Sequence, residues 1–434
     1  MPPLTAGPSP TPATCARLGE DGTGPGQAVP VTPEAPGLSA AARDAVAESL
    51  HMVGQAIRQI AAESYASLFR ERPDLLHRLF NRGNQATGEQ QAALANGLAG
   101  FAALLVHRPY IEVRTVLERI AHKHVSVGVT PEQYELIHHH LMAAFRTVLG
   151  VEATERLIAG WSEVYWIMAD ALVRREAELG ARLGIEAGRH WRSWRVVQRT
   201  TEAHGIVSLL LEPADEWPAD DFLPGQYVSV AVPVDDDSFQ IRQYSVSCAP
   251  GAKRLRITVE LLDRPGRPAG EVSAYLHHTA VLGTRLLLSP PCGEVTLDGG
   301  DNPLLFVSYG VGITPFVSMI GHLARENSGR SVTHVHVDRG ALHHPHRFEM
   351  EDALERLPAG RGLLVYDDLE CAPAGARRPP VDFSGLSLPP GTVAYLCGPT
   401  SFLVRTRAAL VRAGLAPAAI RYEVFGPELW SAPS

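Results

Sequence analysis

The chain has 434 residues, of which 45% are hydrophobic and 20% are charged. This composition is typical of globular proteins, and the length suggests roughly three domains. The formal net charge of −8 leaves no basic surplus to neutralise phosphates, so we expect no nucleic-acid partner. No apolar run approaches the roughly 18 residues of a membrane span. The 5 scattered cysteines lack CxxC spacing, which favours reduced thiols in a cytoplasmic protein over disulfides or a zinc site.

The first segment, residues 1–37, is rich in Pro, Gly, Thr and Ala. It has almost no large apolar side chains whose burial could offset the entropy lost on ordering, so we predict that it is disordered. Its start, Met1-Pro2-Pro3-Leu4, opens neither a basic nor an apolar run, and we therefore expect no signal peptide.

Residues 38–188 show long helical periods broken by short turns, which predicts an all-α domain. Three apolar stripes in this region each carry one polar residue that can form hydrogen bonds, namely His124, Tyr134 and Glu176. The stripes are Val113-Val116-Leu117-Ile120-His124, Tyr134-Ile137-Leu141-Phe145 and Trp161-Tyr165-Met168-Leu172-Glu176.

On helical geometry alone, each of the three polar residues also has an ordinary explanation. A lone histidine on an apolar face is more often a satisfied core residue than a metal ligand, and the hydroxyl of Tyr134 could reach the surface. Glu176 could turn outward beside Arg174 and Arg175. A buried carboxylate without a partner is costly, however, so an inward-facing Glu176 requires a partner.

Other histidines are expected outside any cofactor site. His122 lies two residues before His124, and two helical residues rotate a side chain by about 200°, so His122 should leave the apolar face and be solvated. The side chains of the run His138-His139-His140 diverge around a helix axis for the same reason, and we expect no metal site there.

Residues 189–297 contain short alternating runs punctuated by Pro and Gly, which is the pattern of a small antiparallel β-barrel. The runs are Gln226 to Val232, Gln240 to Ser247 and Arg254 to Leu261. Within them, the tetrapeptide Arg242-Gln243-Tyr244-Ser245 suits a flavin. A guanidinium can bind a diphosphate bidentately, a phenol ring can cover an isoalloxazine, and a hydroxyl can reach the redox-active nitrogen of that ring.

Residues 298–434 alternate strands with helices and predict an α/β domain. The segments are Pro303–Ser308, Gly310–Pro315, Phe316–Ala324 and Val332–Val337. Glycines directly after a strand let a diphosphate approach backbone N–H groups at a helix start. Gly310 and Gly312 meet this condition, although their spacing is not the six-residue dinucleotide fingerprint.

Two sets of motifs stand out along the chain. In the helical region they are Tyr65-Ala66-Ser67-Leu68-Phe69, Leu79-Phe80-Asn81, Asn84-Gln85, Gly88-Glu89-Gln90, Ile120-Ala121-His122-Lys123-His124, Pro131-Glu132-Gln133-Tyr134 and Arg175-Glu176-Ala177-Glu178. In the remainder they are Pro224-Gly225-Gln226-Tyr227, Arg242-Gln243-Tyr244-Ser245, Gly310-Val311-Gly312-Ile313-Thr314-Pro315 and Tyr395-Leu396-Cys397-Gly398-Pro399. On these motifs, the helical region resembles the globin domain of flavohaemoglobins, and the remainder resembles a ferredoxin-reductase-like flavin and nicotinamide module.

From about Leu38 to its end, the chain is similar to flavohaemoglobins in domain order. The resemblance implies a multidomain fold: an all-α globin, then an antiparallel β-barrel FAD domain, then a Rossmann-like NAD(P) domain. It also implies a haem b whose iron is bound by His124, the proximal ligand, with Tyr134 and Glu176 orienting and polarising that histidine. The other implied residues around the haem are Tyr65 and Gln90 on the distal side, Phe80 against the ring, and Lys123 and Glu423 near the haem–flavin junction.

The same resemblance implies sites for FAD and NAD(P)H. The implied FAD residues are Tyr227, Arg242, Gln243, Tyr244, Ser245, Gly270, Val272 and Ser273. The implied nicotinamide-side residues are Gly310, Val311, Gly312, Ile313, Thr314, Pro315, Cys397, Gly398 and Pro399, together with Val424, Phe425, Gly426 and Pro427, whose aromatic ring would shield the flavin. Two positions depart from the family: Glu260 stands where relatives often carry Lys or Arg, and Tyr309 where they usually carry Ala.

The implied function is nitric oxide dioxygenation. NAD(P)H would reduce FAD, FAD would reduce haem, and NO would react with O2 to give nitrate. A flavin suits this order because nicotinamide gives up two electrons as a hydride, whereas a haem iron accepts one at a time. We expect a monomer that acts on NO and O2. Two alternatives stay open: a haem–flavin reductase of O2, peroxides or quinones, and a gas-binding globin sensor kept ferrous by its own reductase.

Overall fold

The computed structural model describes residues 37–80, 82–107, 113–185, 190–215, 222–235, 238–251, 253–263, 270–386 and 388–424. Apart from Gly37, the predicted disordered tail lies outside the described residues. The predicted nicotinamide-side residues Phe425, Gly426 and Pro427 lie outside them as well.

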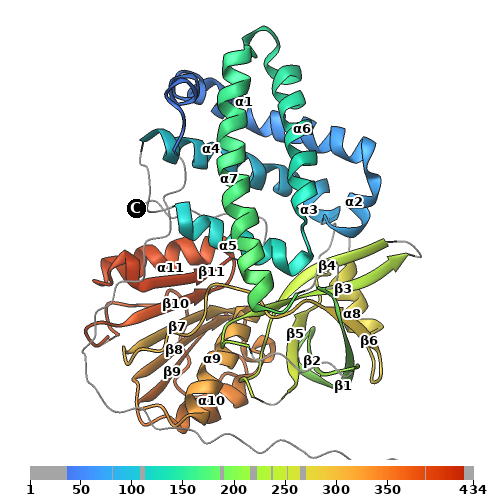
Figure 1. The fold of residues 1–434 in the computed structure, drawn as a ribbon. Coiled ribbons are helices and arrows are strands. Elements are labelled where there is room, and N and C mark those ends of the chain that lie inside the picture. Colours follow the sequence, from blue (N-terminus) through green and yellow to red (C-terminus); the bar gives the residue numbers. More distant parts are fainter. Residues whose placement is uncertain are drawn as a thin grey trace, which may run out of the picture. The chain divides into compact units, whose positions relative to one another are not determined.

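The first part of the described chain is a group of seven α-helices, and the predicted all-α fold of this region is confirmed (Figure 1). They are α1 (Ala40–Glu71), α2 (Pro73–Arg78), α3 (Arg82–Ala86), α4 (Glu89–His107), α5 (Val113–Val127), α6 (Pro131–Leu149) and α7 (Glu155–Arg182), with a 3-10 turn η1 (Gly150–Glu152) before α7. Side-chain caps explain where several of them begin. The Ser39 hydroxyl accepts a hydrogen bond from a main-chain N–H in the first turn of α1, and Thr154 does the same for α7.

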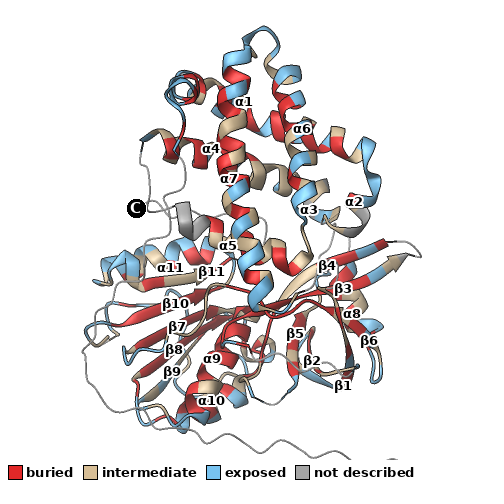
Figure 2. Cartoon of the chain, viewed as in Figure 1, coloured by how far each residue is buried: buried red, intermediate tan, exposed pale blue. Residues whose placement is uncertain are grey.

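The long helices bury one face and expose the other (Figure 2), and the buried faces are largely apolar. The buried ring of Trp161 on α7 lies against Phe145 on α6, with ring centroids 5.5 Å apart, and its indole N–H donates to Ser49 on α1 at 3.0 Å. Phe145 and Trp161 belong to the apolar stripes named from the sequence, so helical periodicity correctly predicts these core positions. Within the described part of the chain, no helix combines the length and apolar character needed to cross a bilayer.

The second region is an antiparallel six-stranded sheet with the strand order β4-β3-β6-β1-β2-β5. The strands are β1 (Arg192–Ala203), β2 (Ile206–Pro213), β3 (Tyr227–Asp235), β4 (Ser238–Ser245), β5 (Leu255–Glu260) and β6 (Arg285–Leu288), and one helix, α8 (Glu271–His278), belongs with them. A β-bridge between Val246 and Ile257 joins the two ends of this order, so the sheet closes as the predicted barrel. The alternating runs Gln226 to Val232 and Gln240 to Ser247 form the hairpin β3–β4, in which Tyr227 pairs with Ser245.

The third region is a parallel five-stranded sheet with the order β11-β10-β7-β8-β9. Its elements are β7 (Leu304–Tyr309), η2 (Gly310–Ile313), α9 (Thr314–Arg325), β8 (Val332–Asp338), η3 (Ala341–His343), α10 (Arg347–Glu355), β9 (Gly360–Tyr366), β10 (Val393–Cys397), α11 (Thr400–Arg412), η4 (Pro417–Ala419) and β11 (Ile420–Glu423). Helices α9 and α10 pack on one face of the sheet and α11 on the other (Figure 1). The strand order reverses between β7 and β10, and α/β folds bind ligands at such a switch point.

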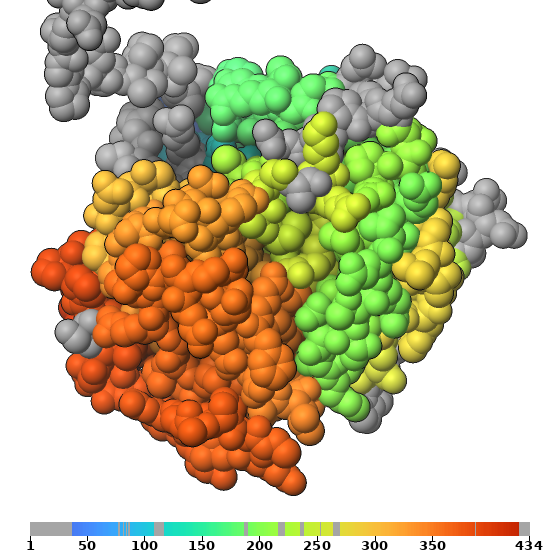
Figure 3. Space-filling model, turned by 90° about the horizontal axis from the view of Figure 1, so that it is seen from below, coloured from blue at the N-terminus to red at the C-terminus, as the bar shows by residue number. Residues whose placement is uncertain are grey.

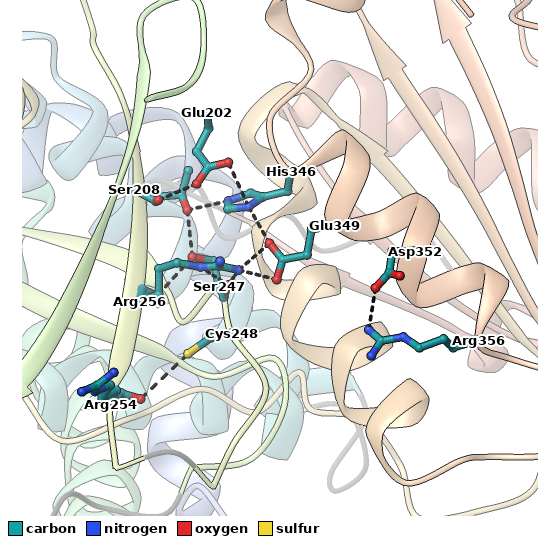
Figure 4. Close-up of polar contacts among 11 residues, drawn as sticks. Glu202, Ser208, Ser247, Cys248, Arg254, Arg256, His346, Glu349, Asp352 and Arg356 are labelled. Carbon is teal, nitrogen blue, oxygen red and sulfur yellow. Dashed lines mark hydrogen bonds and ion pairs between the residues drawn. The ribbon is translucent and has the colours of Figure 1, made fainter. Parts of the chain in front are cut away.

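The barrel and the parallel-sheet region lie side by side on the face shown in Figure 3. Polar contacts connect them (Figure 4). Arg256 on β5 makes two 2.8 Å hydrogen bonds to the carboxylate of Glu349 on α10. His346, just before α10, bonds the hydroxyl of Thr258 at 2.8 Å and lies 3.4 Å from the carboxylate of Glu202. The α10 end of the parallel-sheet region is thereby held against the barrel.

Candidate cofactor sites around one cavity

A cavity of about 840 Å³ is lined by residues from the helices, the barrel and the parallel-sheet region. It brings together most of the site residues that the sequence predicts. The predicted residues that line it are Tyr65, Phe80, Gln90, Lys123, His124, Tyr134, Tyr227, Arg242, Gln243, Tyr244, Ser245, Gly270, Val272, Ser273, Val311, Thr314, Glu423 and Val424. Its volume lies within the usual range for cofactor-sized ligands.

His124, Tyr134 and Glu176 meet at one point although they come from three helices. The Nδ1 of His124 lies 2.8 Å from the Tyr134 hydroxyl and 2.8 Å from Oε1 of Glu176, and the hydroxyl donates to the same Oε1 at 2.5 Å. The Glu176 side chain is only 10% exposed, so its carboxylate faces inward and not toward solvent. Because a carboxylate only accepts, the imidazole proton lies on Nδ1.

This arrangement fits a haem. With its proton on Nδ1, His124 presents the lone pair of Nε2, and no hydrogen bond among the described residues uses that nitrogen. Its side chain is 31% exposed and lines the cavity. The cavity wall around it is largely apolar, as a porphyrin requires, and includes Leu75, Leu79, Leu94, Leu98, Val127, Val129, Ile137, Met168 and Leu172. A histidine held through Nδ1 by a carboxylate is the usual environment of a metal-binding imidazole.

Tyr65, Gln90 and Phe80 lie together on another part of the cavity wall. The side chain of Gln90 hydrogen-bonds the buried Tyr65 phenol, whose pKa is raised by burial. The Phe80 ring meets the Tyr65 ring edge-on at 5.5 Å and the Phe69 ring at 5.3 Å. A tyrosine hydroxyl with one fixed partner is a well-oriented donor for a small polar ligand in an otherwise apolar pocket.

Arg242 is a half-buried cation on the wall of the cavity. On β4, it donates from Nη1 to the Ile241 carbonyl at 2.7 Å, and no carboxylate of the described residues forms an ion pair with it. Partial burial lowers the pKa of Arg242, and the like charge of Arg82 acts in the same direction. A guanidinium that lines a cavity without a carboxylate partner favours an anionic ligand, so Arg242 fits the diphosphate of FAD.

The neighbours of Arg242 present aromatic and hydroxyl groups to the same space. Tyr244 and Ser245 both line the cavity, and burial raises the pKa of the Tyr244 phenol. Gln243 donates to the Ser229 hydroxyl at 3.1 Å. The Tyr227 ring is buried and lies beside Ser245 through the pairing of β3 with β4. A phenol and a hydroxyl thus face the same cavity, and their contacts with a flavin ring stay a prediction.

The start of α8 forms a further edge of the flavin side. Gly270 is the N-cap residue, and the Ser273 hydroxyl donates to its carbonyl at 2.9 Å while accepting from the N–H of Leu262 at 3.1 Å. A Cβ on Gly270 would lie 2.7 Å from that hydroxyl oxygen, so a larger residue here would displace the Ser273 side chain. Glu260 also lines the cavity and forms a 3.4 Å ion pair with Arg339, which offsets the negative charge introduced at this position.

The nicotinamide-side glycines lie at the switch point of the parallel sheet. Gly310 has a φ of 55°, and a Cβ on Gly312 would lie 2.6 Å from the Cys397 carbonyl oxygen. The turn of η2 therefore packs directly on the end of β10, which continues into Gly398 and Pro399. Val311 and Thr314 from this turn line the cavity. The other predicted residues of this part do not line it, namely Gly310, Gly312, Ile313, Pro315, Cys397, Gly398 and Pro399.

Lys123 and Glu423 both line the cavity, and each influences the pKa of the other. Burial lowers the pKa of Lys123, and the like charge of Arg242 adds to this effect. Burial raises the pKa of Glu423 to about 8, with the like charge of Glu294 adding to it.

Comparison with known proteins identifies the family to which a chain with these regions belongs. A globin family model matches residues 62–172. The chain is 40% identical over 365 residues to the flavohaemoprotein of Bordetella pertussis, covering 81% of this chain and 89% of that protein. It is 36% identical over 408 residues to the flavohaemoprotein of Rhizobium meliloti, covering 91% of this chain and 100% of that protein. The chain belongs to the flavohaemoprotein family.

Solved structures agree with this membership. A flavohaemoglobin from Malassezia yamatoensis with bound FAD and haem matches with a TM-score of 0.82 and 30% identity, covering 90% of this chain and 100% of that one. The flavohaem-like FAD/NAD-binding domain of a nitric oxide dioxygenase from Vibrio cholerae matches with a TM-score of 0.51 and 30% identity, covering 55% of this chain and 100% of that one. As a flavohaemoprotein, the chain joins a globin to a ferredoxin-reductase-like module and is an oxidoreductase.

One sequence prediction for this flavohaemoprotein is wrong. His122 is not solvated: it is 8% exposed, and its Nδ1 accepts a hydrogen bond from the N–H of Gly293 at 3.0 Å. The helix turns His122 away from the cavity as predicted, but the barrel covers that side. Arg119 is a further residue of the cavity wall that no sequence motif indicated. It donates to the Glu294 carboxylate at 2.7 Å and to the Tyr422 carbonyl at 3.1 Å. Arg119 and His122 are three residues apart, a helical spacing that marks a second polar face on α5.

Proposed function

We propose that the protein is an NAD(P)H-dependent nitric oxide dioxygenase that converts NO and O2 into nitrate. Its cofactors are haem b, FAD and NAD(P)H. Atoms and electrons balance if each NO combines with one O2 and one electron to give nitrate, so one hydride serves two turnovers. When bound, FAD divides the hydride into single electrons and haem supplies the iron at which O2 is activated.

One observation carries this proposal. The haem-type histidine arrangement and the flavin-type Arg242–Ser245 segment open on the same cavity. The turn after β7, which supplies Val311 and Thr314, reaches that cavity as well. A chain that only bound gas would not require a nicotinamide-type switch point and a flavin-type cation site beside its haem pocket. The V. cholerae relative described above as a nitric oxide dioxygenase supports the same activity.

We assign the following roles to the side chains around the haem. His124 binds the iron through Nε2, and Glu176 with Tyr134 holds the imidazole and the proton on its Nδ1. Tyr65, oriented by Gln90, donates a hydrogen bond toward ligands on the distal side, and Phe80 packs against the ring.

On the flavin side, Arg242 binds the diphosphate, and Tyr244 and Ser245 contact the isoalloxazine. Lys123 and Glu423 set the charge between the two cofactors. Where η2 meets α9, the backbone N–H groups at the start of α9 would hold the diphosphate of NAD(P)H. The Gly312 contact with Cys397 shapes this position.

The experiment that tests the proposal is NO consumption by the purified protein in air-saturated buffer with NADH, with nitrate measured as product. Nitric oxide dioxygenation predicts NADH-dependent loss of NO and formation of nitrate. Reduction of O2, peroxides or quinones without NO consumption would identify a haem–flavin reductase. Stable gas binding with no turnover of any of these would identify a sensor.

The organisation of the molecule is also part of the proposal. We propose domains at residues 38–188, 189–297 and 298–434, acting as a cytoplasmic monomer on NO and O2. The boundary between 188 and 189 falls between α7 and β1, and that between 297 and 298 falls between β6 and β7. Light scattering on the purified protein tests the monomer, and limited proteolysis tests the boundaries.

A further inference from the structure

His122 connects the helix that carries the proximal histidine to the barrel. Its Nδ1 accepts from the Gly293 N–H at 3.0 Å, and its Nε2 lies 3.3 Å from Oε1 of Glu118. A main-chain N–H only donates, so Nδ1 carries no proton and Nε2–H donates to the carboxylate. The two nitrogens therefore make two different bonds, one to the barrel and one within the globin.

The second bond continues toward the haem side. Glu118 is held by Arg175 of α7, with Nε to Oε2 at 2.7 Å and Nη2 to Oε1 at 2.5 Å. Two parallel hydrogen bonds of this type fix both the position and the orientation of the groups. Arg175 directly precedes Glu176, which bonds the Nδ1 of His124. A connected path thus runs from Gly293 through His122, Glu118 and Arg175 to the residue that orients His124.

The barrel-facing side of α5 has helical spacing. Arg119, His122 and Ser126 lie at i, i+3 and i+7, and all three contact the barrel. Arg119 bonds Glu294 at 2.7 Å, and Ser126 accepts a hydrogen bond from the Ser229 hydroxyl at 2.8 Å. Contacts over two helical turns fix the rotation of α5 about its axis. The direction in which Lys123 and His124 face the cavity depends on that rotation.

The barrel end of the path is equally constrained. Gly293 has a φ of 120°, and a Cβ there would lie 3.2 Å from the Tyr227 ring, so the position requires glycine. Cys292, the preceding residue, exchanges two 2.8 Å main-chain hydrogen bonds with Tyr227. Tyr227 and Cys292 belong to the same buried cluster as the globin helices, and Tyr227 lines the cavity. Gly293 is therefore fixed relative to the flavin side of the cavity.

We propose that His122 is a positioning residue for electron transfer from FAD to haem, which it serves by fixing α5 to the Cys292–Glu294 turn. This inference rests on the transfer of electrons from FAD to haem in the proposed function. His122 touches neither cofactor site. Its effect is to set the geometry between them.

Three substitutions separate the two bonds of His122. In His122→Asn the amide oxygen takes the place of Nδ1 and still accepts from Gly293. In His122→Gln the amide nitrogen takes the place of Nε2 and still donates to Glu118. His122→Ala removes both bonds. Because the Gly293 bond is the one that reaches the barrel, the Asn variant should stay close to wild type and the Gln variant should behave like Ala.

The measurement is anaerobic stopped flow of the holoenzyme with NADH and carbon monoxide, following the flavin and haem bands separately. We expect His122→Ala and His122→Gln to slow haem reduction about 10-fold, while flavin reduction and haem content stay at wild-type values. A second readout is hydrogen–deuterium exchange at the Gly293 amide. It should accelerate in the Ala and Gln variants and remain protected in the Asn variant.

His140 provides a matched control. It is as buried as His122, at 3% exposure, and its Nδ1 bonds the Ser67 hydroxyl at 2.9 Å within the helical domain. His140→Ala should lower the melting temperature without slowing haem reduction. Equal slowing in His140→Ala, or wild-type haem reduction in His122→Ala and His122→Gln, overturns the inference. If wild-type haem is not reduced after the flavin, the proposed electron route itself fails, which is a separate outcome.

Discussion

The imidazole of His124 shares its carboxylate partner with a second hydrogen-bond donor. Glu176 accepts from both the imidazole Nδ1 and the Tyr134 hydroxyl, and burial, with the adjacent Glu176 charge, raises the pKa of that phenol well above its usual value. The phenol therefore stays protonated and the negative charge remains on Glu176. A carboxylate in this position increases electron donation by the opposite nitrogen and stabilises the ferric state of a bound iron.

Glu176→Gln tests this effect because it keeps the size and hydrogen-bonding ability of the side chain but removes its charge. We expect the variant to retain haem, to raise the Fe(III)/Fe(II) midpoint potential and to lower the iron–histidine stretching frequency. Activity should fall about 10- to 100-fold, as is common for such partners. Glu178→Gln is the control, since Glu178 bonds the exposed side of Arg175 on the same helix at 2.8 Å. An unchanged potential in Glu176→Gln would contradict the assignment.

Tyr65→Phe removes one hydroxyl from the distal side and leaves the ring packing with Phe69 and Phe80 in place. The lost hydrogen bond to bound O2 is charge-assisted and contributes about 1.5 to 3 kcal/mol, or roughly ten- to a hundredfold in affinity. We expect faster O2 dissociation from the ferrous protein and slower NO consumption at low O2. Stopped-flow O2 dissociation is the measurement, and an unchanged rate would remove Tyr65 from the site.

The pH dependence of stability should report on Glu423. Its pKa is about 8 in the folded protein and about 4.5 when unfolded, because burial and then Glu294 disfavour the charge. Between these values the folded state binds one more proton than the unfolded state. Stability therefore falls as pH rises through this window, by at most about 1.4 kcal/mol per pH unit. Melting temperatures of Glu423→Gln from pH 5 to 8 should lack this slope, and a parallel decline in both proteins would show that other groups cause it.

Among the secondary-structure elements, η2 and β10 make a close contact in the parallel-sheet region. Gly312→Ala would place a Cβ 2.6 Å from the Cys397 carbonyl oxygen, which requires the backbone to move. We expect the KM for NADH to rise about tenfold or more, with FAD and haem content unchanged. The matched control is Gly329→Ala, because a Cβ on Gly329 meets no atom within 4 Å. Steady-state kinetics measure the KM for NADH in both variants. An equal rise in Gly312→Ala and Gly329→Ala would show that the contact between η2 and β10 does not shape the NADH site.

Helical periodicity predicted the inward direction of His124, Tyr134 and Glu176, since each ends or begins an apolar stripe. It could not show that three stripes on three helices converge at one point, because convergence depends on how the helices cross. The same periodicity placed His122 on the correct side of α5 and assigned the wrong surroundings. A polar helix face has the same residue pattern whether water or another domain covers it.

The same limit applies to strands. Alternation in Gln226–Val232 and Gln240–Ser247 predicted two strands, β3 and β4, whose pairing is local in the chain. The position of β6 between β3 and β1 had no signal in the sequence, because its pairings are with residues far along the chain. Arg242 could be predicted as a phosphate ligand from its motif. Only the structure shows that its guanidinium lines the cavity without a carboxylate partner among the described residues.

At the scale of the whole molecule, the haem and flavin sites share one cavity but use different elements. We therefore expect His124→Ala to lose haem and keep FAD, and Arg242→Ala to lose FAD and keep haem. Absorbance spectra of the purified variants measure both cofactors at once, through the Soret and flavin bands. Equal loss of both cofactors in either variant would show that the two sites are not independent.

The contact between His122 and Gly293 spans 171 positions of the chain, and this separation has a consequence during synthesis. At about 5–20 residues per second, a ribosome needs roughly ten to thirty seconds to reach Gly293 after His122 has been made. The globin helices are complete well before then, and the barrel-facing side of α5 meets water in the interval. The charges of Glu118, Arg119 and Arg175 keep that side hydrated on the nascent chain, and the same charges later form the contacts that hold the helix in place.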